Sequence, residues 1–146
     1  MCTSTRRGFT LVELLIVIAI IAVLSTLAVA GLTVARSKAR DTKRTADIAQ
    51  LQKAFSLYAT SASAYPVAAS ELCIDGTDAV ATTLKTSGVM TIVPGDPIAK
   101  STLPAAAAGG AHCYAYQSAT GTTYALKYYQ ERASDRGPEG TITVGP

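Results

Sequence analysis

The chain has 146 residues, which is enough for one domain with one modest core. Its net charge of +3 is too small to indicate a nucleic-acid partner, and one His with no Trp leaves little material for metal or acid–base chemistry. The sequence contains no nucleophile–base pair, phosphate loop or paired-carboxylate site, so it predicts no enzyme.

Residues 1–8 are a short polar stretch with two arginines, and an almost wholly apolar run follows at 9–35. From Leu14 to Ala35 the chain carries no charge. A helix of that length, at about 1.5 Å per residue, extends roughly 33 Å and can cross a hydrocarbon core of about 30 Å. The run therefore predicts a membrane-spanning helix.

Glu13 stands just inside the leading edge of this run. A carboxylate at the centre of a membrane helix costs about 2.5–3.5 kcal/mol, so an acid in such a segment indicates a function. Its neighbours one turn further on, Ile16 and Val17, cannot pair with it. We therefore expect nothing within its own helix to neutralise this carboxylate.

Residues 8–15, which read GFTLVELL, resemble the leader junction of type IV prepilins and type II secretion pseudopilins. The resemblance implies that a prepilin peptidase and methylase cleaves after Gly8 and that Phe9 becomes N-methylated. It also implies that Glu13 pairs with the terminal amine of a neighbouring subunit, which gives a buried charge its partner on assembly and sets the register.

By the same resemblance, the chain is a structural filament subunit that begins as a single-pass precursor in the inner membrane and ends in an extracytoplasmic filament. Its implied partners are copies of itself, related pilins and an inner-membrane assembly platform. The choice between a surface pilus and a secretion pseudopilus stays open. Many family members carry a helix-kinking Pro where this chain has Ala30 and Gly31, and the major pseudopilin usually has Trp where this chain has Ile98.

Two other interpretations of the apolar run remain. Residues 28–30 read AVA and offer a signal-peptidase site after Ala30, which would release a secreted binding domain. A plain signal anchor without a filament role is also compatible with the run.

Five cations follow the run and form a basic stretch. By the positive-inside rule they favour a cytoplasmic C-terminal side, whereas the resemblance places that side outside. Four of them share one helix stripe, which we expect to face solvent or lipid headgroups. Acidic contacts on adjacent subunits and DNA capture by the filament are further hypotheses. The five are Arg36, Lys38, Arg40, Lys43 and Arg44, and the stripe omits Lys38.

The helix is predicted to continue beyond the membrane through 36–62, because this segment contains no Pro or Gly and has an amphipathic spacing. The apolar positions are Ile48, Leu51, Phe55 and Tyr58. A helix over 9–62 is about 80 Å long, so we expect its membrane half to protrude and to find lipid or other copies. Tyr65-Pro66 ends it.

Residues 63–146 predict a globular head, which gives an α+β fold in which the helix packs on a small antiparallel sheet. We expect 67–110 to be a connecting region with one short helix capped by Asp78. A hairpin around Thr120-Gly121 and a third strand complete the prediction. The expected elements are a helix at 78–86 and strands at 112–118, 122–131 and 141–144.

Cys2 lies in the leader, which leaves Cys73 and Cys113 as an even pair in an exported domain. A disulfide between them would contribute roughly 4 kcal/mol through loop entropy, and two unpaired thiols are the alternative. Asp135 and Glu139 hint at the acidic calcium loop of the family, although two acids alone are usually a solvated loop. No other cofactor is expected.

Overall fold

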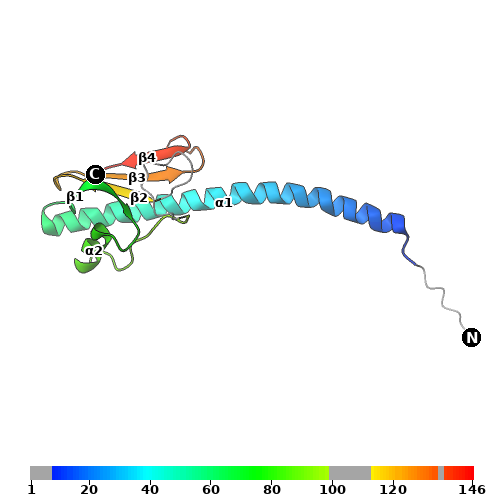
Figure 1. Ribbon diagram of the computed structural model, residues 1–146, viewed down its shortest axis with the longest axis horizontal. Helices are drawn as coiled ribbons and strands as arrows, with labels where there is room; N and C mark the ends of the chain where they lie inside the picture. Colours follow the sequence, from blue (N-terminus) through cyan, green and yellow to red (C-terminus); the bar gives the residue numbers. More distant parts are fainter. Residues whose placement is uncertain (1–7, 99–112, 135–136) are drawn as a thin grey trace, which may run out of the picture. The chain divides into compact units, whose positions relative to one another are not determined.

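The computed structural model describes residues 8–98, 113–134 and 137–146. The chain divides into two compact units, Met1–Arg36 and Ser37–Pro146. A single helix, α1 (Leu11–Ala62), runs through both (Figure 1). The predicted helix is confirmed, with its start two residues later than expected.

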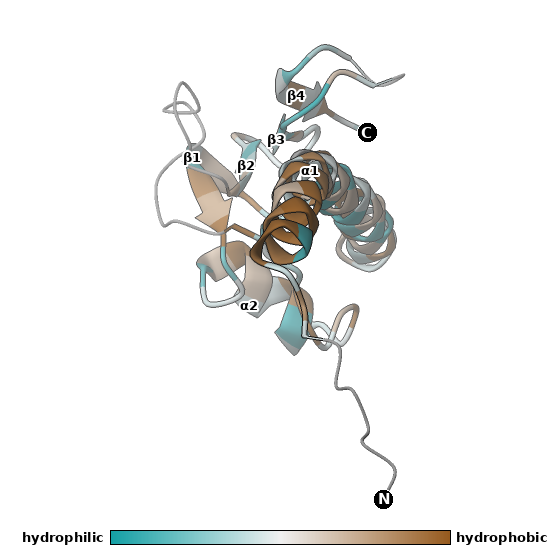
Figure 2. Cartoon of the chain, turned by 90° about the vertical axis from the view of Figure 1, so that its right-hand side faces the viewer, coloured by the Kyte–Doolittle hydropathy of each residue, from teal (hydrophilic) through white to brown (hydrophobic). Residues whose placement is uncertain are grey.

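In the N-terminal unit, every side chain described between residues 8 and 36 is exposed. By length and composition, this part of α1 is able to cross a membrane. The colouring of Figure 2 shows its apolar character. The unit therefore has a helix but no core of its own.

In the C-terminal unit, α1 ends where its backbone turns. Ser63 has a φ of 58°, which breaks the helical repeat. Two residues further on, the Tyr65 N–H donates to the carbonyl of Gly121 at 2.8 Å. Gly121 has a φ of +77°, and a Cβ there would lie 3.1 Å from the Tyr65 carbonyl oxygen. Glycine is needed here for both its φ and the close approach.

Four antiparallel strands form one sheet in the order β1-β2-β3-β4. Three correspond to predicted strands, each with somewhat different bounds. The predicted start of the first hairpin strand, His112, lies outside the described residues. The strands are β1 (Ala68–Ile74), β2 (Tyr114–Ser118), β3 (Ala125–Gln130) and β4 (Gly140–Val144).

The expectation that residues 67–110 contain one short helix and otherwise only connections is wrong for their first part, because β1 lies there. The sequence AASELCI does not alternate apolar and polar side chains, so it lacks the usual signal of a half-buried strand. Its pairing with β2 also shifts register between Ala68 and Leu72. The strand is therefore defined by its partner across the sheet and not by a local pattern.

One face of α1 packs against the sheet, which confirms the predicted α+β fold. Phe55 contacts the ring of Tyr116 at a centroid distance of 4.7 Å and that of Tyr124 at 5.1 Å. These contacts add ring geometry to the burial of apolar area. The buried core includes Ile48, Leu51, Phe55, Ile74, Val80, Leu84, Tyr114, Tyr116, Leu126 and Tyr128.

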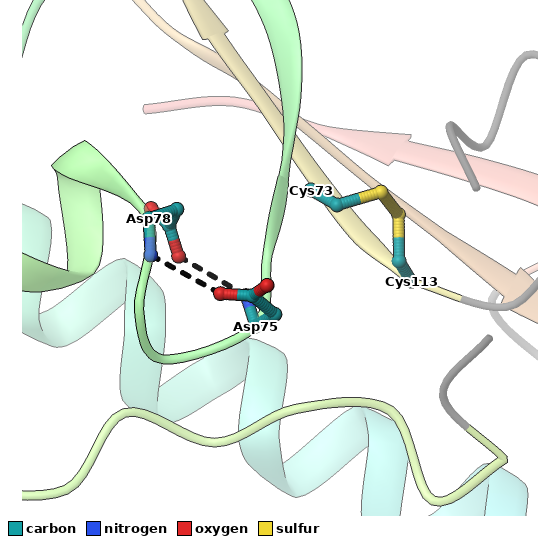
Figure 3. The surroundings of a disulfide bond; sticks show 4 residues. All are labelled: Cys73, Asp75, Asp78 and Cys113. Carbon is teal, nitrogen blue, oxygen red and sulfur yellow. Dashed lines mark hydrogen bonds between the residues drawn. A yellow bond between two sulfur atoms is a disulfide. The ribbon is translucent and has the colours of Figure 1, made fainter. Parts of the chain in front are cut away.

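The short helix α2 (Ala79–Thr86) begins where the sequence predicted it. Asp78 is its N-cap, and the carboxylate accepts from the Ala81 amide at 2.9 Å. Asp75 in turn accepts from the Asp78 amide (Figure 3). It also accepts from the Thr77 amide, and the two bonds shape the turn ahead of the helix.

Candidate functional site

The junction between Gly8 and Phe9 is open to solvent. Phe9 is 80% exposed. A Cβ built on Gly8 would meet no atom within 4 Å, and its φ is not in the left-handed region. The fold therefore gives no steric reason for glycine at position 8, and the peptide bond after it is accessible.

Thr10 and Glu13 form a reciprocal cap at the start of α1. The Glu13 carboxylate oxygen Oε2 accepts from the Thr10 amide at 2.8 Å and from its hydroxyl at 2.9 Å. The Thr10 hydroxyl oxygen accepts from the Glu13 amide at 3.2 Å. This is the capping box, Thr-x-x-Glu, which satisfies two of the free donors at a helix start.

The expectation that nothing in its own helix neutralises Glu13 is unaffected, because Thr10 precedes the helix and donates as a neutral group. The hydrogen bonds of the cap were nevertheless missed, because only the residues one turn further on were considered, whereas the donor lies three residues before. The Thr-x-x-Glu pattern was the signal that could have found it. Within the described residues, both hydrogen bonds to the Glu13 carboxylate are accepted by Oε2, and the side chain remains exposed.

Beyond the cap, α1 presents large apolar side chains to its surroundings. The exposed set includes Leu11, Leu14, Ile16, Ile18, Ile20, Ile21, Leu24, Leu27 and Leu32. Burying one such side chain stabilises by about 1.5–3 kcal/mol, so a surface of this size is not stable in water. It requires lipid or protein around it.

The predicted solvent-facing stripe of cations is wrong for Arg44, which is buried with 0% exposure. Its guanidinium donates to Asp96 through Nε at 2.6 Å and Nη2 at 3.1 Å. Nη1 donates to Asp41 and Glu131, each at 2.7 Å. Such a group is unavailable to DNA or to a lipid headgroup.

Arg40 also bonds within the chain. Its Nε donates to Glu131 at 2.7 Å, and its Nη2 pairs with the other carboxylate oxygen. Hydrogen bonds from Arg40, and secondarily from Arg44, lower the pKa of Glu131 to about 2 against the opposing effect of partial burial. The carboxylate partners of these two arginines therefore lie within the same chain and not on an adjacent subunit. Arg36 and Lys43 remain exposed.

Asp47 adds a second buried polar contact between α1 and the sheet, which the sequence did not indicate. Its carboxylate accepts from the Tyr114 hydroxyl at 2.9 Å, and both residues are buried. Burial and, after it, this bond raise the pKa of Tyr114. The tyrosine therefore stays protonated and acts as a donor.

The expected disulfide is present between Cys73 and Cys113, whose Cα atoms are 5.6 Å apart (Figure 3). It joins β1 to the residue directly before β2. The bridge thus fixes the pairing of the strand that the sequence did not reveal.

The suggested calcium pair and the leader cysteine involve residues outside the described ranges. Asp135 and Cys2 both lie there, while Glu139 is described and exposed. Within the described ranges, no group of three or more His, Cys, Asp or Glu side chains is placed to hold a metal ion. Calcium binding stays a prediction.

Comparison with known proteins supports the interpretation of the N-terminus. Residues 3–29 match the family described as the prokaryotic N-terminal methylation motif. The chain is also 41% identical over 64 residues to the type II secretion system core protein G of Escherichia coli (strain K12). That match covers 44% of this chain and 44% of the relative's length. No solved structure matches the chain significantly.

Proposed function

We propose that this chain, which carries the N-terminal methylation motif on a helix with no core of its own, is a structural subunit of a type IV pilus or pilus-like filament. It is made as a single-pass precursor in the inner membrane, cleaved after Gly8 and methylated at Phe9. It then polymerises through the first half of α1. The chain is a substrate of the peptidase and methylase and not itself an enzyme.

The observation that carries this proposal is the exposed apolar surface of α1 next to a processing motif. A lipid bilayer covers this surface in the precursor. After extraction from the membrane, the same surface needs an apolar environment of another kind, which neighbouring copies or related pilins supply. The assembly platform of the inner membrane performs the transfer.

Glu13 is proposed to set the register between subunits. Its carboxylate already accepts two hydrogen bonds from Thr10, but these come from neutral donors. The amine of a neighbouring Phe9 would supply the opposite charge when both are removed from water. The capping box keeps the carboxylate oriented before that partner arrives.

A major pseudopilin of a type II secretion system is the second candidate, because the similar Escherichia coli protein is a core protein of such a system. Filaments sheared from cells separate the two. A surface pilus subunit is found in the sheared fraction. A pseudopilin is absent from it, and its deletion abolishes export of secreted proteins.

The mature N-terminus tests the processing step. Mass spectrometry of the chain from cells is expected to give a first residue of methyl-Phe9, and a Gly8→Val variant is expected to keep its leader with an unchanged fold. A mature chain that begins at Gly31 would instead show release by signal peptidase after Ala30. That result would refute the filament proposal.

Three substitutions separate the charge of Glu13 from its role in the cap. Glu13→Gln keeps an oxygen for the Thr10 donors but loses the charge, whereas Thr10→Ala keeps the charge and the backbone donor but loses both hydroxyl bonds of the cap. We expect Glu13→Gln and Glu13→Ala to be inserted and cleaved yet fail to assemble, whereas Thr10→Ala still assembles. Normal filaments from Glu13→Gln would exclude the register role.

A further inference from the structure

Only Phe9 and Thr10 lie between the bond proposed for cleavage and Leu11, the first residue of α1. The first bond of the helical pattern joins the Leu14 amide to the Thr10 carbonyl at 3.3 Å, which makes Thr10 the N-cap. Within the described residues, neither the Gly8 carbonyl nor the Phe9 carbonyl accepts a hydrogen bond. The Gly8–Phe9 bond therefore lies outside the helix, but close to its end.

The Thr10 hydroxyl holds an amide that a longer helix would use. It accepts from the Glu13 amide at 3.2 Å. In a helix extended by one residue, the Glu13 amide would instead donate to the Phe9 carbonyl, four residues earlier. The same hydroxyl donates to Glu13 Oε2 at 2.9 Å, so an extension of the helix would break two bonds of the capping box. The cap thus opposes growth of α1 towards the leader.

Gly8 is the next available N-cap if the Thr10 hydroxyl is removed. As N-cap residues, glycine and threonine rank together, well above large apolar residues. A helix capped at Gly8 would take the Gly8 carbonyl as its first acceptor, with the Val12 amide as the donor. That carbonyl belongs to the bond to be cut, and a protease reaches a bond in an ordered helix only after the helix opens locally. Loss of the cap would therefore make the bond less accessible.

We propose that Thr10 is a positioning residue for removal of the leader. Its hydroxyl fixes the start of α1 at Leu11 and keeps the Gly8–Phe9 bond outside the helix, where the peptidase binds it. The inference rests on the proposed function, because it concerns the rate of the cleavage proposed there. A chain that is cut more slowly still reaches the mature form, so Thr10→Ala is still expected to assemble.

Initial rates of leader removal from the full chain in detergent, by a purified prepilin peptidase, test the inference. Thr10→Val removes the hydroxyl at nearly constant side-chain shape, and Thr10→Ser retains it. We expect Thr10→Val to raise KM about two- to fivefold and to leave kcat unchanged. An N-cap is worth about fivefold in the helix equilibrium, which corresponds to about 1 kcal/mol, and the apparent KM varies inversely with the competent fraction of the substrate. Thr10→Ser is expected to restore the KM of the unaltered chain.

Thr26→Val is the matched control. It removes the same hydroxyl from α1 at a position where that hydroxyl donates to the Val23 carbonyl, away from the cap. Its KM should equal that of the unaltered chain. The Cα chemical shifts of Gly8 and Phe9 in the uncleaved chain give a reading that does not involve the peptidase. They should move towards helical values in Thr10→Val and stay constant in Thr26→Val.

Four results would overturn the role of Thr10. They are an unchanged KM in Thr10→Val, an equal rise in Thr26→Val, chemical shifts that do not move, and a fall in kcat at constant KM. The last of these would indicate a direct contact between the hydroxyl and the peptidase. Each of them leaves the proposed function intact, because the unaltered chain is still cut. An unaltered chain that is not cut after Gly8 would refute the processing step and this inference with it.

Discussion

The two units of this chain share one helix, α1, but differ in how far they bury its side chains. In the C-terminal unit, α1 buries Ile48, Leu51 and Phe55 against the sheet. Its polar side chains on the same side find partners, as Arg44 does with Asp96. In the N-terminal unit, the described side chains of the same helix are all exposed.

This difference teaches where each unit's stability comes from. The C-terminal unit carries its own core, disulfide and ion-pair network, so its fold is specified within the chain. The N-terminal half of α1 has backbone hydrogen bonds and a cap, and it depends on lipid or other subunits for the rest. All seven tyrosines, which begin at Tyr58, lie in the C-terminal unit, and the chain has no Trp. Tyrosine fluorescence therefore reports on that unit alone.

The largest effect is expected from Arg44→Ala, which leaves the buried carboxylate of Asp96 without its partner. Breaking a buried ion pair from one side typically costs about 3–5 kcal/mol. Urea unfolding of the full chain in detergent, followed by tyrosine fluorescence, measures the loss. The helical signal of the N-terminal half is expected to persist.

Lys43→Ala is the matched control, because Lys43 is adjacent and exposed. It is expected to change the free energy of unfolding by less than about 0.5 kcal/mol. If the two variants have the same unfolding midpoint, the ion-pair network does not stabilise the C-terminal unit.

Removing the disulfide is expected to have the next largest effect. The pair Cys73→Ala and Cys113→Ala releases a bridge that spans 40 residues of sequence. Losing such a bridge costs about 2–4 kcal/mol in the free energy of unfolding. Cys2→Ala serves as the control and should leave the unfolding curve unchanged. A curve for the double variant that overlays the control would contradict a stabilising role.

Acid is expected to weaken the C-terminal unit through Glu131. The pKa of this carboxyl falls from its ordinary value of 4.5 to about 2 in the folded chain. The unfolded chain therefore binds the proton more readily, and the stabilisation is complete above about pH 4.5 and is lost as the pH falls towards 2. Glu131→Gln should be less stable at neutral pH and less sensitive to pH in this window. A similar pH dependence in Glu131→Gln and in the control Glu139→Gln would assign the effect to other groups.

The smallest effect is expected from Gly31→Ala, in the unit without a core. A Cβ at this helical position meets no atom within 4 Å, so the substitution removes backbone freedom without a clash. Alanine in place of glycine stabilises a helix interior by about 0.5–1 kcal/mol. Hydrogen exchange of the amides near residue 31 should slow, while the tyrosine-detected midpoint stays constant. Unchanged exchange would show that Gly31 does not soften the helix.

Local patterns in the sequence predicted much of this structure. The apolar run, the spacing of Ile48, Leu51 and Phe55, and the cap at Asp78 each involve residues within a few turns of one another. Their physical signals are therefore complete within a short window. The disulfide was predictable for a different reason, since a chain that is expected to be exported and has two remaining cysteines offers one pairing.

The features that escaped prediction depend on residues far apart in sequence. Arg44 reads locally as a solvent-facing cation, and only the fold places Glu131 and Asp96 beside it. Strand β1 likewise lacks alternation and is defined by its pairing with β2. For the candidate site, the sequence supplied Gly8, Phe9 and Glu13 but not the Thr10 cap. That omission came from examining only one direction along the helix.

The continuity of α1 has a mechanical consequence. A pull on its first turn is carried along the backbone of one helix of 52 residues. Within the C-terminal unit, the traction first reaches the clamps of Arg40 and Arg44 on Glu131 and Asp96, ahead of the apolar contacts around Phe55. The disulfide joins β1 to the residue directly before β2 and is not part of this load path. Yielding under force should therefore begin at charged contacts, so acid would lower the rupture force before the core itself is weakened.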